Sequence, residues 1–487
     1  MSSVRVRIAP SPTGNLHIGT ARTALFNFLF AKHHQGQFIL RIEDTDLERS
    51  EEQYVQNIYD GLKKLGLCWD EGPDIGGAFG PYVQSERLAL YQEWAQTLVD
   101  QGDAYLCYLN DAELEALRQQ AAEQKRPFVY RQNLIETESR NALQQDPTRS
   151  PSIRFRVPLD EPEIVFQDLI RGEVRFDTTL IGDFVILKSN GTPSYNFAVV
   201  VDDLTMQISH VIRGEDHVSN TPRQLMLYKA LKHNPPLFAH VGMILAPDRT
   251  KLSKRHGATA VSDYIDQGYL PEAFCNFLSL LGWSLPDGQE VSSLENLIHQ
   301  FELTRVAHSP AIFDKDKLDW FNGLYIRQCP LDELLQRSQK YLPEWLTQQY
   351  SDSALQLMLG AVREPLKTLS ELPAALHYFA KGPVTYDAQV TEAVWPDAET
   401  QNILRRVESE FLPNTDFSSP EGIAAALKEF TQQLKPLKVK TILWAIRAAV
   451  TGQVHGADLS ITLHLLGKPV VQQRLEQALE HLKVLAY

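Results

Sequence analysis

The sequence predicts an α/β protein in which an open parallel-sheet fold near the N-terminus is interrupted by an α+β insertion and followed by an all-helical region. Strand, helix and strand patterns succeed one another before residue 47. From about residue 72 to residue 151 the sequence becomes polar and rich in Gln, and after Tyr325 apolar residues recur at the 3.6-residue period of a helix. At 487 residues the chain is too long for one compact core, so we expect three or four domains.

The N-terminal segment predicts a parallel βαβ unit. Apolar residues alternate with arginines over residues 4–8, which favours a strand, and Pro-Ser-Pro-Thr-Gly at 10–14 must turn the chain. A helix is expected from near His17, and the apolar run 38–42 predicts a second strand that leads into the acidic segment 43–46. Strand, helix and strand in this order indicate two parallel strands joined by a crossover helix.

Further elements follow from the same patterns. Ser50 and Gln53 match a capping box for a helix whose apolar spacing runs from Tyr54 to Leu65. The other expected elements are strands at 153–157, 174–176, 183–188, 197–201 and 208–213, a helix at 112–123, one after Thr221-Pro222, and C-terminal helices at 354–362, 422–434, 441–450 and 471–482.

Composition excludes several classes of protein. With 43% hydrophobic and 22% charged residues and no repeat of fixed period, the chain is an ordinary soluble globular protein rather than a disordered or fibrous one. The N-terminus lacks an apolar signal core, and the longest nearly apolar stretch, 273–283, is too short to span a bilayer, so we expect a cytoplasmic protein. A net charge of -14 argues against nucleic-acid binding over the whole surface, although it leaves room for a local basic track.

The first candidate motif is Arg-Ile-Ala-Pro-Ser-Pro-Thr-Gly-Asn-Leu-His-Ile-Gly-Thr at residues 7–20. It joins a strand end to a helix N-terminus, where backbone N–H groups and the helix dipole suit a phosphate. Neither G-x-G-x-x-G nor G-x-x-x-x-G-K-[ST] is present, which disfavours dinucleotide binding and P-loop chemistry. Taken alone, the segment fits a Pro-rich turn before a capped helix at least as well.

The second candidate motif is Lys-Leu-Ser-Lys-Arg-His-Gly at residues 251–257, after the apolar run 241–245. Three cations within five residues, ending near a Gly, suit the charge of a triphosphate. An isolated basic pentamer is more often a solvated loop. Neither motif therefore identifies a function by itself.

Together the two segments resemble the HIGH and KMSKS signatures of class I aminoacyl-tRNA synthetases. The surrounding segments resemble bacterial-type glutamyl-tRNA synthetase, and the likeness runs from Arg5 to the C-terminus. These segments are Arg41-Ile-Glu-Asp-Thr-Asp, Ser194-Tyr-Asn-Phe, Val211-Ile-Arg-Gly-Glu-Asp-His and Asn322-Gly-Leu-Tyr-Ile. Chance would hardly place all of them in one order.

The resemblance implies a Rossmann-like class I synthetase catalytic domain at 1–81 and 191–250. It also implies an α+β acceptor-binding insertion at 82–190, a connecting domain with the KMSKS loop at 251–326, and an all-α anticodon-binding region at 327–487. The implied activity is that of a glutamate–tRNA ligase, which forms glutamyl-adenylate from L-glutamate and ATP with Mg²⁺ and then acylates the terminal adenosine of tRNA(Glu). Whether tRNA(Gln) is charged as well stays open, and the family suggests a monomer.

For ATP, the resemblance implies catalytic roles for His17, Lys251 and Lys254. Thr20 stands where the general signature has a second His, so any role of that imidazole is taken by a hydroxyl here or is absent. The implied ATP-binding set is Ser11, His17, Gly19, Thr20, His217, Lys251 and Lys254.

For glutamate, a planar guanidinium is the best partner of a carboxylate in a partly dry pocket, which makes Arg7 and Arg213 the candidates. By resemblance, Glu43 would bind the substrate ammonium. The full implied set is Arg7, Ala9, Ser11, Glu43, Tyr195 and Arg213. Structural alternatives remain: Arg7 as an exposed strand residue, Arg213 as a partner of Glu215 or Asp216, Glu43 as a salt bridge near a helix, and Tyr195 as a core aromatic.

The cysteines and a group of basic residues bear on metal and tRNA binding. Some family members hold zinc in the insertion with a C-x-C pair, but Cys107-Tyr-Leu lacks the second thiol and the next cysteine is Cys275, so we predict no protein-bound zinc. The four cysteines lie far apart, which disfavours a disulfide framework. A basic stripe is expected to contact tRNA phosphates, with a solvated helix face as the equal alternative; it consists of Lys435, Lys438, Lys440 and Arg447.

Three rival functions make different demands on the sequence. A glutaminyl-tRNA synthetase would be expected to carry a β-barrel anticodon region, and the helical period after Tyr325 argues against it. A tRNA-modifying glutamyl-queuosine enzyme resembles only the catalytic half. A non-catalytic tRNA-binding paralogue should have lost His17, Lys251 or Lys254, and all three are present.

Overall fold

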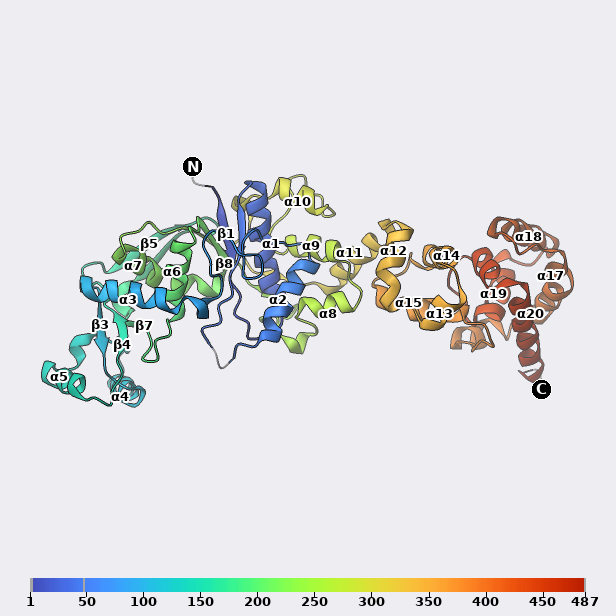
Figure 1. Cartoon of the computed structure of the whole chain (residues 1–487). Coiled ribbons are helices and arrows are strands. Elements are labelled where there is room, and N and C mark those ends of the chain that lie inside the picture. The colour runs from blue at the N-terminus through green and yellow to red at the C-terminus, as the bar shows by residue number, and fades with distance from the viewer. Residues whose placement is uncertain (1–2, 47–48, 486–487) are drawn as a thin grey trace. The chain divides into compact units, whose positions relative to one another are not determined.

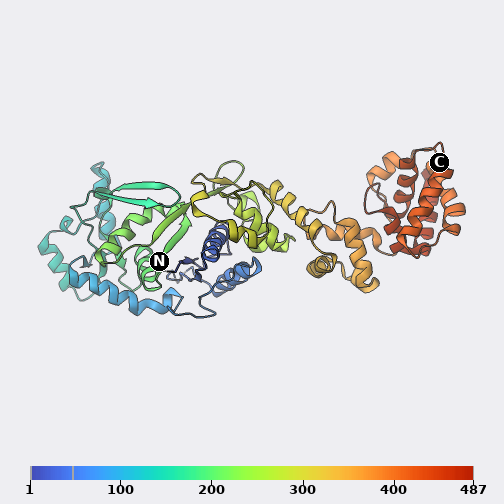
Figure 2. The ribbon, with the colours of Figure 1, turned by 90° about the horizontal axis from the view of Figure 1, so that it is seen from above.

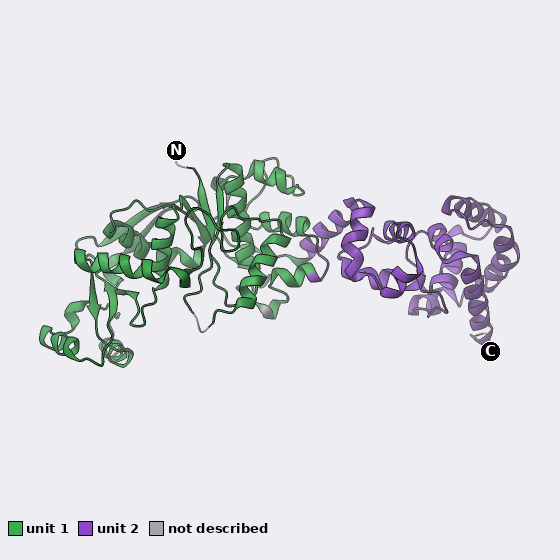
Figure 3. Ribbon diagram, in the orientation of Figure 1, with its two compact units in different colours: residues 1–265, 271–315 green, residues 266–270, 316–487 purple. Residues whose placement is uncertain are grey.

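The structure is a computed structural model that describes residues 3–46 and 49–485. The chain divides into two compact units (Figure 3): residues 1–265 with 271–315, and residues 266–270 with 316–487. The first unit contains all the strands, and the second is helical. This division is coarser than the four parts expected from the sequence, whose boundaries stay predictions.

The predicted βαβ unit is confirmed. Strands β1 (Arg5–Ile8) and β2 (Gln37–Leu40) are parallel and in register from Arg5 opposite Gln37, and helix α1 (Ile18–His33) connects them. Helix α1 packs against β1 and also against β8 (His210–Gly214), beside which β1 lies (Figure 1). Phe26, Leu29 and most other residues of α1 are buried, so this helix forms the centre of the first unit.

A four-stranded sheet has the order β6-β5-β9-β8. Strands β5 (Glu163–Asp168), β9 (Leu237–Val241) and β8 are parallel, whereas β6 (Gly172–Asp177) returns antiparallel to β5. Figure 2 shows the β5–β6 hairpin as two long paired strands. Helix α7 (Thr221–Ala230) joins β8 to β9, as the Thr-Pro start predicted.

The expected strand at 197–201 is wrong, because these residues lie in helix α6 (Tyr195–Thr205). Phe197 to Val201 are all at most 2% exposed, since the helix packs against α3 (Leu88–Gln101), α7 and β7 (Phe184–Leu187). A short apolar run buried on all sides looks the same in a helix and in a strand, so periodicity could not separate the two. The helical conformation of this segment matters for the cavity, because the last turn of α6 contains the buried residues Asp202 and Asp203.

The insertion is α+β, as expected. Strands β3 (Ala104–Cys107), β4 (Ser152–Phe155) and β7 form an antiparallel sheet in the order β3-β4-β7. Helices α4 (Asp111–Glu123) and α5 (Thr137–Gln145) lie in the long connection between β3 and β4. The predicted elements at 112–123, 153–157, 174–176 and 183–188 are confirmed within two residues at each end.

The expected capping box of Ser50 and Gln53 is wrong. Helix α2 (Glu52–Lys64) begins one residue later, with Glu51 at the N-cap and no side-chain cap. Among the described residues the buried hydroxyl of Ser50 has no hydrogen-bond partner, and the amide of Gln53 donates to the carboxylate of Glu51. The remaining elements of the first unit are β10 (Ile244–Leu245), α8 (Val261–Asp266), α9 (Pro271–Ser279), α10 (Leu294–Gln300) and β11 (Ala311–Ile312).

The second unit confirms the predicted helices. Its last helices pack together, and the longest of them, α20 (Leu459–Leu485), is interrupted at Gly467, whose φ of 77° is non-helical. No helix in the described ranges is long and apolar enough to cross a membrane. The other α-helices are α11 (Lys315–Gln328), α12 (Leu331–Ser338), α13 (Glu344–Gln349), α14 (Asp352–Val362), α15 (Leu372–Leu376), α16 (Thr400–Arg406), α17 (Leu412–Asn414), α18 (Pro420–Gln433) and α19 (Val439–Thr451).

Candidate active site

A cavity of about 430 Å³ opens in the first unit where β1, β8 and β9 end. The carboxyl ends of parallel strands are the usual place for a ligand in an open α/β sheet. Every residue predicted to bind ATP or glutamate lines this cavity except Lys254, whose side chain lies outside the described structure. The lining set is Arg7, Ala9, Ser11, His17, Gly19, Thr20, Glu43, Tyr195, Arg213, His217 and Lys251.

His17 is the N-cap residue of α1. Its Nδ1 accepts a hydrogen bond from the backbone N–H of Gly19 at 3.1 Å, so a neutral ring carries its proton on Nε2. Burial lowers the pKa of His17, and the positive charge of Lys251 lowers it further. The result is a neutral imidazole with an N–H donor at the N-terminus of a helix, whose dipole favours an anion.

The two signature motifs lie next to each other. The backbone N–H of Ile18 donates to the carbonyl of Thr259 at 3.0 Å, and that of Val261 donates to the carbonyl of Leu16 at 2.9 Å. Lys251 is exposed but lines the cavity, at a bridge to Leu245. The chain thus holds the start of α1 against the segment that follows the basic loop, which an isolated solvated loop would not require.

Arg7 is not an exposed strand residue, since only 4% of it is exposed. Its Nε and Nη2 donate to the two carboxylate oxygens of Asp203 at 3.0 and 3.2 Å. The fully buried Arg41 donates to Asp203 at 2.7 Å and to Glu43 at 3.0 Å, so the carboxylate of Asp203 accepts from two guanidinium groups.

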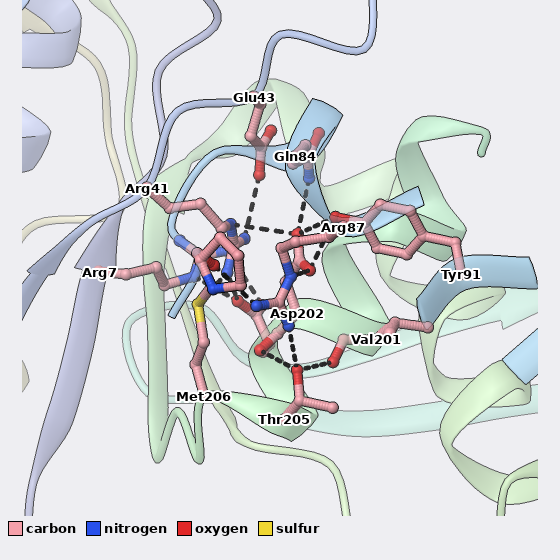
Figure 4. Close-up of polar contacts among 12 residues, drawn as sticks. Arg7, Arg41, Glu43, Gln84, Arg87, Tyr91, Val201, Asp202, Thr205 and Met206 are labelled. Atoms are coloured by element: carbon pink, nitrogen blue, oxygen red, sulfur yellow. Dashed lines mark hydrogen bonds and ion pairs between the residues drawn. The ribbon is translucent and has the colours of Figure 1, made fainter. Parts of the chain in front are cut away.

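Glu43 is buried at the edge of the same network. Burial raises its pKa, although the charges of Arg41 and Arg7 act in the opposite direction. The structural alternative for Glu43 is therefore partly realised, because it is ion-paired with Arg41, yet its carboxylate also lines the cavity. Figure 4 shows how the network continues to Asp202, which accepts from Arg87 at 2.7 Å and lies 3.6 Å from Arg41.

Arg213 pairs with neither Glu215 nor Asp216. Glu215 contacts Arg171 instead, and the guanidinium of Arg213 is held by two neutral side chains, His240 at 3.0 Å and Thr221 at 2.9 Å. Burial lowers the pKa of Arg213. A guanidinium that is 5% exposed and has no direct carboxylate partner in the described residues is suited to receive an anion.

Tyr195 and His217 face each other at the cavity wall. The Tyr195 hydroxyl lies 3.0 Å from Nδ1 of His217, and the tyrosine is 37% exposed, so it is not a core aromatic. Around the hydroxyl, loss of solvent and then the charge of Glu43 raise the pKa of Tyr195 to about 12. Loss of solvent, together with the charges of Arg213 and Arg7, lowers the pKa of His217 to about 4. Both groups are therefore neutral near pH 7.

Sequence reasoning missed several residues of the site. Arg22 lines the cavity and donates to the carbonyl of Leu281 at 3.1 Å; burial lowers its pKa to about 10. Arg41 and Asp203 were missed as well; Asp203 accepts hydrogen bonds from both Arg7 and Arg41. The one available signal was the pair of adjacent aspartates that ends an apolar run, because buried carboxylates need cationic partners.

Cys107 lies in a small cluster with Tyr105 and Tyr130 in the insertion. Its sulfur is 3.6 Å from the hydroxyl of Tyr130, and both residues are buried. The thiol and the phenol are therefore hydrogen-bonded to each other. The absence of protein-bound zinc stays a prediction.

The predicted basic stripe lies in the second unit. Lys435, Lys438 and Lys440 are exposed, and the ammonium of Lys440 lies 4.1 Å above the ring of Trp444. Arg447 differs, because it is half-buried and donates to the carbonyl of Ala457. The three lysines therefore present exposed ammonium groups that can contact phosphates, whereas Arg447 also hydrogen-bonds to the backbone.

Comparisons with known proteins cover the whole chain. A family model described as "tRNA synthetases class I (E and Q), catalytic domain" matches residues 3–320, and one described as "Anticodon binding domain" matches residues 333–479. The chain is 46% identical over 487 residues to a glutamate–tRNA ligase of Heliobacterium modesticaldum, covering 99% of this chain and 97% of that one. It is also 46% identical over 480 residues to a glutamate–tRNA ligase of Carboxydothermus hydrogenoformans, covering 97% and 99%.

Solved structures agree with these matches. The crystal structure of a glutamate tRNA ligase from Elizabethkingia meningosepticum in complex with its amino acid aligns with a TM-score of 0.90 and 32% identity, over 99% of this chain and all of that one. The similar enzyme of Elizabethkingia anophelis aligns with a TM-score of 0.88 and 31% identity, over 98% of this chain and all of that one. This chain therefore belongs to the class I (E and Q) tRNA synthetase family, and within it to the glutamate–tRNA ligases.

Proposed function

We propose that this chain joins L-glutamate to tRNA(Glu) in two steps, through glutamyl-adenylate, with the cavity of the first unit as the site of both steps. The observation that carries the proposal is the pairing of two buried guanidinium groups with the HIGH helix and the basic loop around one cavity. Glutamate attacks the α-phosphorus of ATP and pyrophosphate leaves. The 2'-hydroxyl of the terminal adenosine then takes the acyl group, and AMP leaves.

The amino-acid side of the proposal rests on charge. L-Glutamate carries two carboxylates and one ammonium, and the cavity offers Arg7, Arg213 and Glu43 as counterparts. Arg213 is assigned to the side-chain carboxylate, because it alone of the three has no ion-pair partner among the described residues. Glu43 is assigned to the ammonium, and Ala9, Ser11 and Tyr195 would line the pocket.

The phosphate side rests on donors at the start of α1. Phosphoryl displacement asks the protein mainly for positioning and for donors where charge develops. His17 would donate Nε2–H, the backbone at Gly19 and Thr20 would let the phosphates approach the N-terminus of α1, and Lys251 with Lys254 would stabilise the departing pyrophosphate. The exposed carboxylate of Asp216 lines the cavity and is an oxygen ligand of the kind that would hold Mg²⁺, which would neutralise phosphate charge there.

The tRNA would extend from the insertion at 82–190 to the helical region at 327–487, with the catalytic halves at 1–81 and 191–250 and the connecting part at 251–326. Lys435, Lys438 and Lys440 support phosphate contacts, since all three are exposed. A monomer acting in the cytoplasm without zinc completes the proposal. Charging of tRNA(Gln) is left to experiment.

Charging with radiolabelled glutamate tests the proposal. Purified tRNA(Glu) and tRNA(Gln) are each incubated with the protein, ATP and Mg²⁺, with radiolabelled glutamine in a parallel reaction. Glutamyl-tRNA(Glu) is expected and glutaminyl-tRNA is not. Acylation with glutamine alone would instead indicate a glutaminyl-tRNA synthetase, and tRNA binding without acylation would indicate a non-catalytic paralogue. A labelled tRNA(Gln) product would show the wider specificity.

A further inference from the structure

Asp168, His240 and Arg213 form a buried row across three neighbouring parallel strands. Asp168 ends β5, His240 lies on β9, and Arg213 on β8 stands directly opposite His240 in the register of the two strands. The strands β5 and β9 are paired at Asp168 and Phe238. His240 is 0% exposed, Asp168 4% and Arg213 5%, so solvent does not separate the three side chains.

The tautomer of His240 follows from its two neighbours. The Asp168 carboxylate lies 2.6 Å from Nδ1, and Nε of Arg213 lies 3.0 Å from Nε2. A guanidinium can only donate, so Nε2 must present its lone pair and Nδ1 must carry the proton. Burial lowers the pKa of His240, which keeps the ring neutral.

Asp168 is itself held in one orientation. Its carboxylate accepts from the backbone N–H groups of Ile170 at 3.0 Å, Arg171 at 2.9 Å and His240 at 3.2 Å, as well as from the imidazole. Burial opposes its ionisation, but these hydrogen bonds outweigh burial and lower the pKa of Asp168. The fixed carboxylate therefore keeps the proton of His240 on Nδ1, as a carboxylate behind a functional imidazole commonly does.

The row leaves one nitrogen of Arg213 without a partner. His240 takes Nε, Thr221 takes Nη2 at 2.9 Å, and Nη1 is buried without a hydrogen bond to any residue of the described ranges. A buried charged donor without an acceptor is costly, so it is expected to meet one when the site is in use. Arg213 lines the cavity, and a substrate carboxylate there would supply the acceptor.

We infer that Asp168 and His240 are positioning residues for glutamate: through a neutral imidazole they orient Arg213 so that Nη1 is presented to the side-chain carboxylate of the substrate. This inference rests on the proposed role of Arg213. The neutral ring is essential to it, because His240 must accept from the guanidinium without neutralising its charge. A carboxylate at the position of His240 would form an ion pair with Arg213 and compete with the substrate.

Two substitutions of His240 separate positioning from packing. The amide of Asn can occupy the place of Nδ1 and donate to Asp168, but it cannot reach Arg213, whereas Gln can place its oxygen near Nε2 and accept from Arg213. His240→Asn is expected to raise the KM for glutamate about 30-fold with the KM for ATP within about twofold, since small misplacements of a binding group cost up to about 100-fold. His240→Gln is expected to stay within about fivefold of the natural enzyme. Rates are measured by ATP–pyrophosphate exchange on the full-length protein.

The outcomes distinguish this inference from the proposed function. If Asn and Gln raise the glutamate KM equally, or if both raise the KM values for glutamate and ATP alike, the row only packs the strands and the inference is overturned. Arg213→Met reports on the proposed function: an unchanged glutamate KM in that variant would remove the role of Arg213 itself. A large rise there with no effect of His240→Asn would leave the proposed function standing and overturn only the row.

Asp168→Asn provides a reading that does not depend on the His240 variants. An asparagine there lets the ring move its proton to Nε2, where it would face the donor of Arg213. The glutamate KM is expected to rise about tenfold, again with little change for ATP. An unchanged glutamate KM in a folded Asp168→Asn protein would contradict the inference, and circular dichroism melting establishes that each variant is folded.

Discussion

The two guanidinium groups of the cavity are buried to the same extent but are held in opposite ways. Arg7 pairs with Asp203, and the buried network around this pair contains the guanidinium groups of Arg7, Arg41 and Arg87 and the carboxylates of Asp203, Glu43 and Asp202, so the charge on that side is balanced within the protein. Among the described residues Arg213 has only neutral hydrogen-bond partners, which are the side chains of His240 and Thr221 and the backbone carbonyl of His217. We expect the balanced charges around Arg7 to stabilise the fold. The unpaired charge of Arg213 would instead bind a substrate carboxylate, as proposed above. Similar burial therefore does not imply a similar role.

Removal of the shared carboxylate is expected to have the largest effect. In Asp203→Asn, Arg7 would keep a buried charge without its carboxylate partner and Arg41 would lose one of its partners, and breaking a buried pair costs about 3–5 kcal/mol of the free energy of unfolding. Urea unfolding measures the loss. The matched control is Glu163→Gln, which breaks the exposed pair with Arg175 and should cost less than about 1 kcal/mol. Equal losses in the two variants would show that the Arg7 side does not support the fold.

Removal of Arg213 is expected to lower catalytic efficiency strongly and stability little, the reverse of what we expect for Asp203→Asn. In Arg213→Met the catalytic efficiency for glutamate in pyrophosphate exchange should fall about 150-fold, the equivalent of about 3 kcal/mol for a lost buried charge contact. The efficiency for ATP at saturating glutamate should change less than about threefold. Stability should change by less than about 1.5 kcal/mol, because the variant conserves volume and breaks no ion pair. A large loss of stability with similar losses for both substrates would indicate a folding defect and erase the contrast with Asp203.

The sequence predicted the residues that line the cavity better than the residues that hold them in place. Arg7, Glu43 and Arg213 were found because they fall in segments that resemble one family, and all three line the cavity. Asp203 contacts Arg7 across 196 residues and His240 contacts Arg213 across 27, so no local pattern predicts these contacts. Asp203 was further hidden because the run before it looked like a strand, which would have placed its side chain elsewhere.

The fold shows the same limit. The βαβ unit and the C-terminal helices were predicted because their periodicity is long or their turn residues are clear. The buried helix α6 was not, since Phe197 to Val201 are apolar on every side. The capping box failed at Ser50 because the helix began one residue later than the motif required. Local rules fail where tertiary packing decides.

The exposed phosphate side of the cavity should show a smaller effect than either arginine. Lys251→Ala is expected to slow adenylate formation about 30-fold, less than a buried donor would, because water screens part of the lysine charge. The glutamate KM should change little. Single-turnover adenylate formation measures the rate, and Arg255→Ala is the control, since Arg255 lies in the same loop but donates to Thr250 at 2.9 Å. Equal rates in the two variants would mean that general loop charge, rather than Lys251, assists the reaction.

The smallest expected effect is on the pKa of His217, and it tests the unbalanced charge directly. Burial, Arg213 and Arg7 lower this pKa to about 4, below the ordinary 6.5. Above pH 6.5 the ring is neutral in both states, and the contribution of His217 to the free energy of unfolding is fully present. As the pH falls from 6.5 to about 4, the unfolded chain binds the proton more readily than the folded protein does, so this contribution decreases. NMR titration of ¹⁵N-labelled histidines, assigned with His217→Gln, measures the pKa in the folded state. In Arg213→Met it should rise, because a cation without a counter-charge has been removed, whereas in Glu163→Gln it should not move. A pKa near 6.5 in the natural protein, or one unaffected by Arg213→Met, would mean that the charge of Arg213 is already balanced and that the two sides of the cavity are alike.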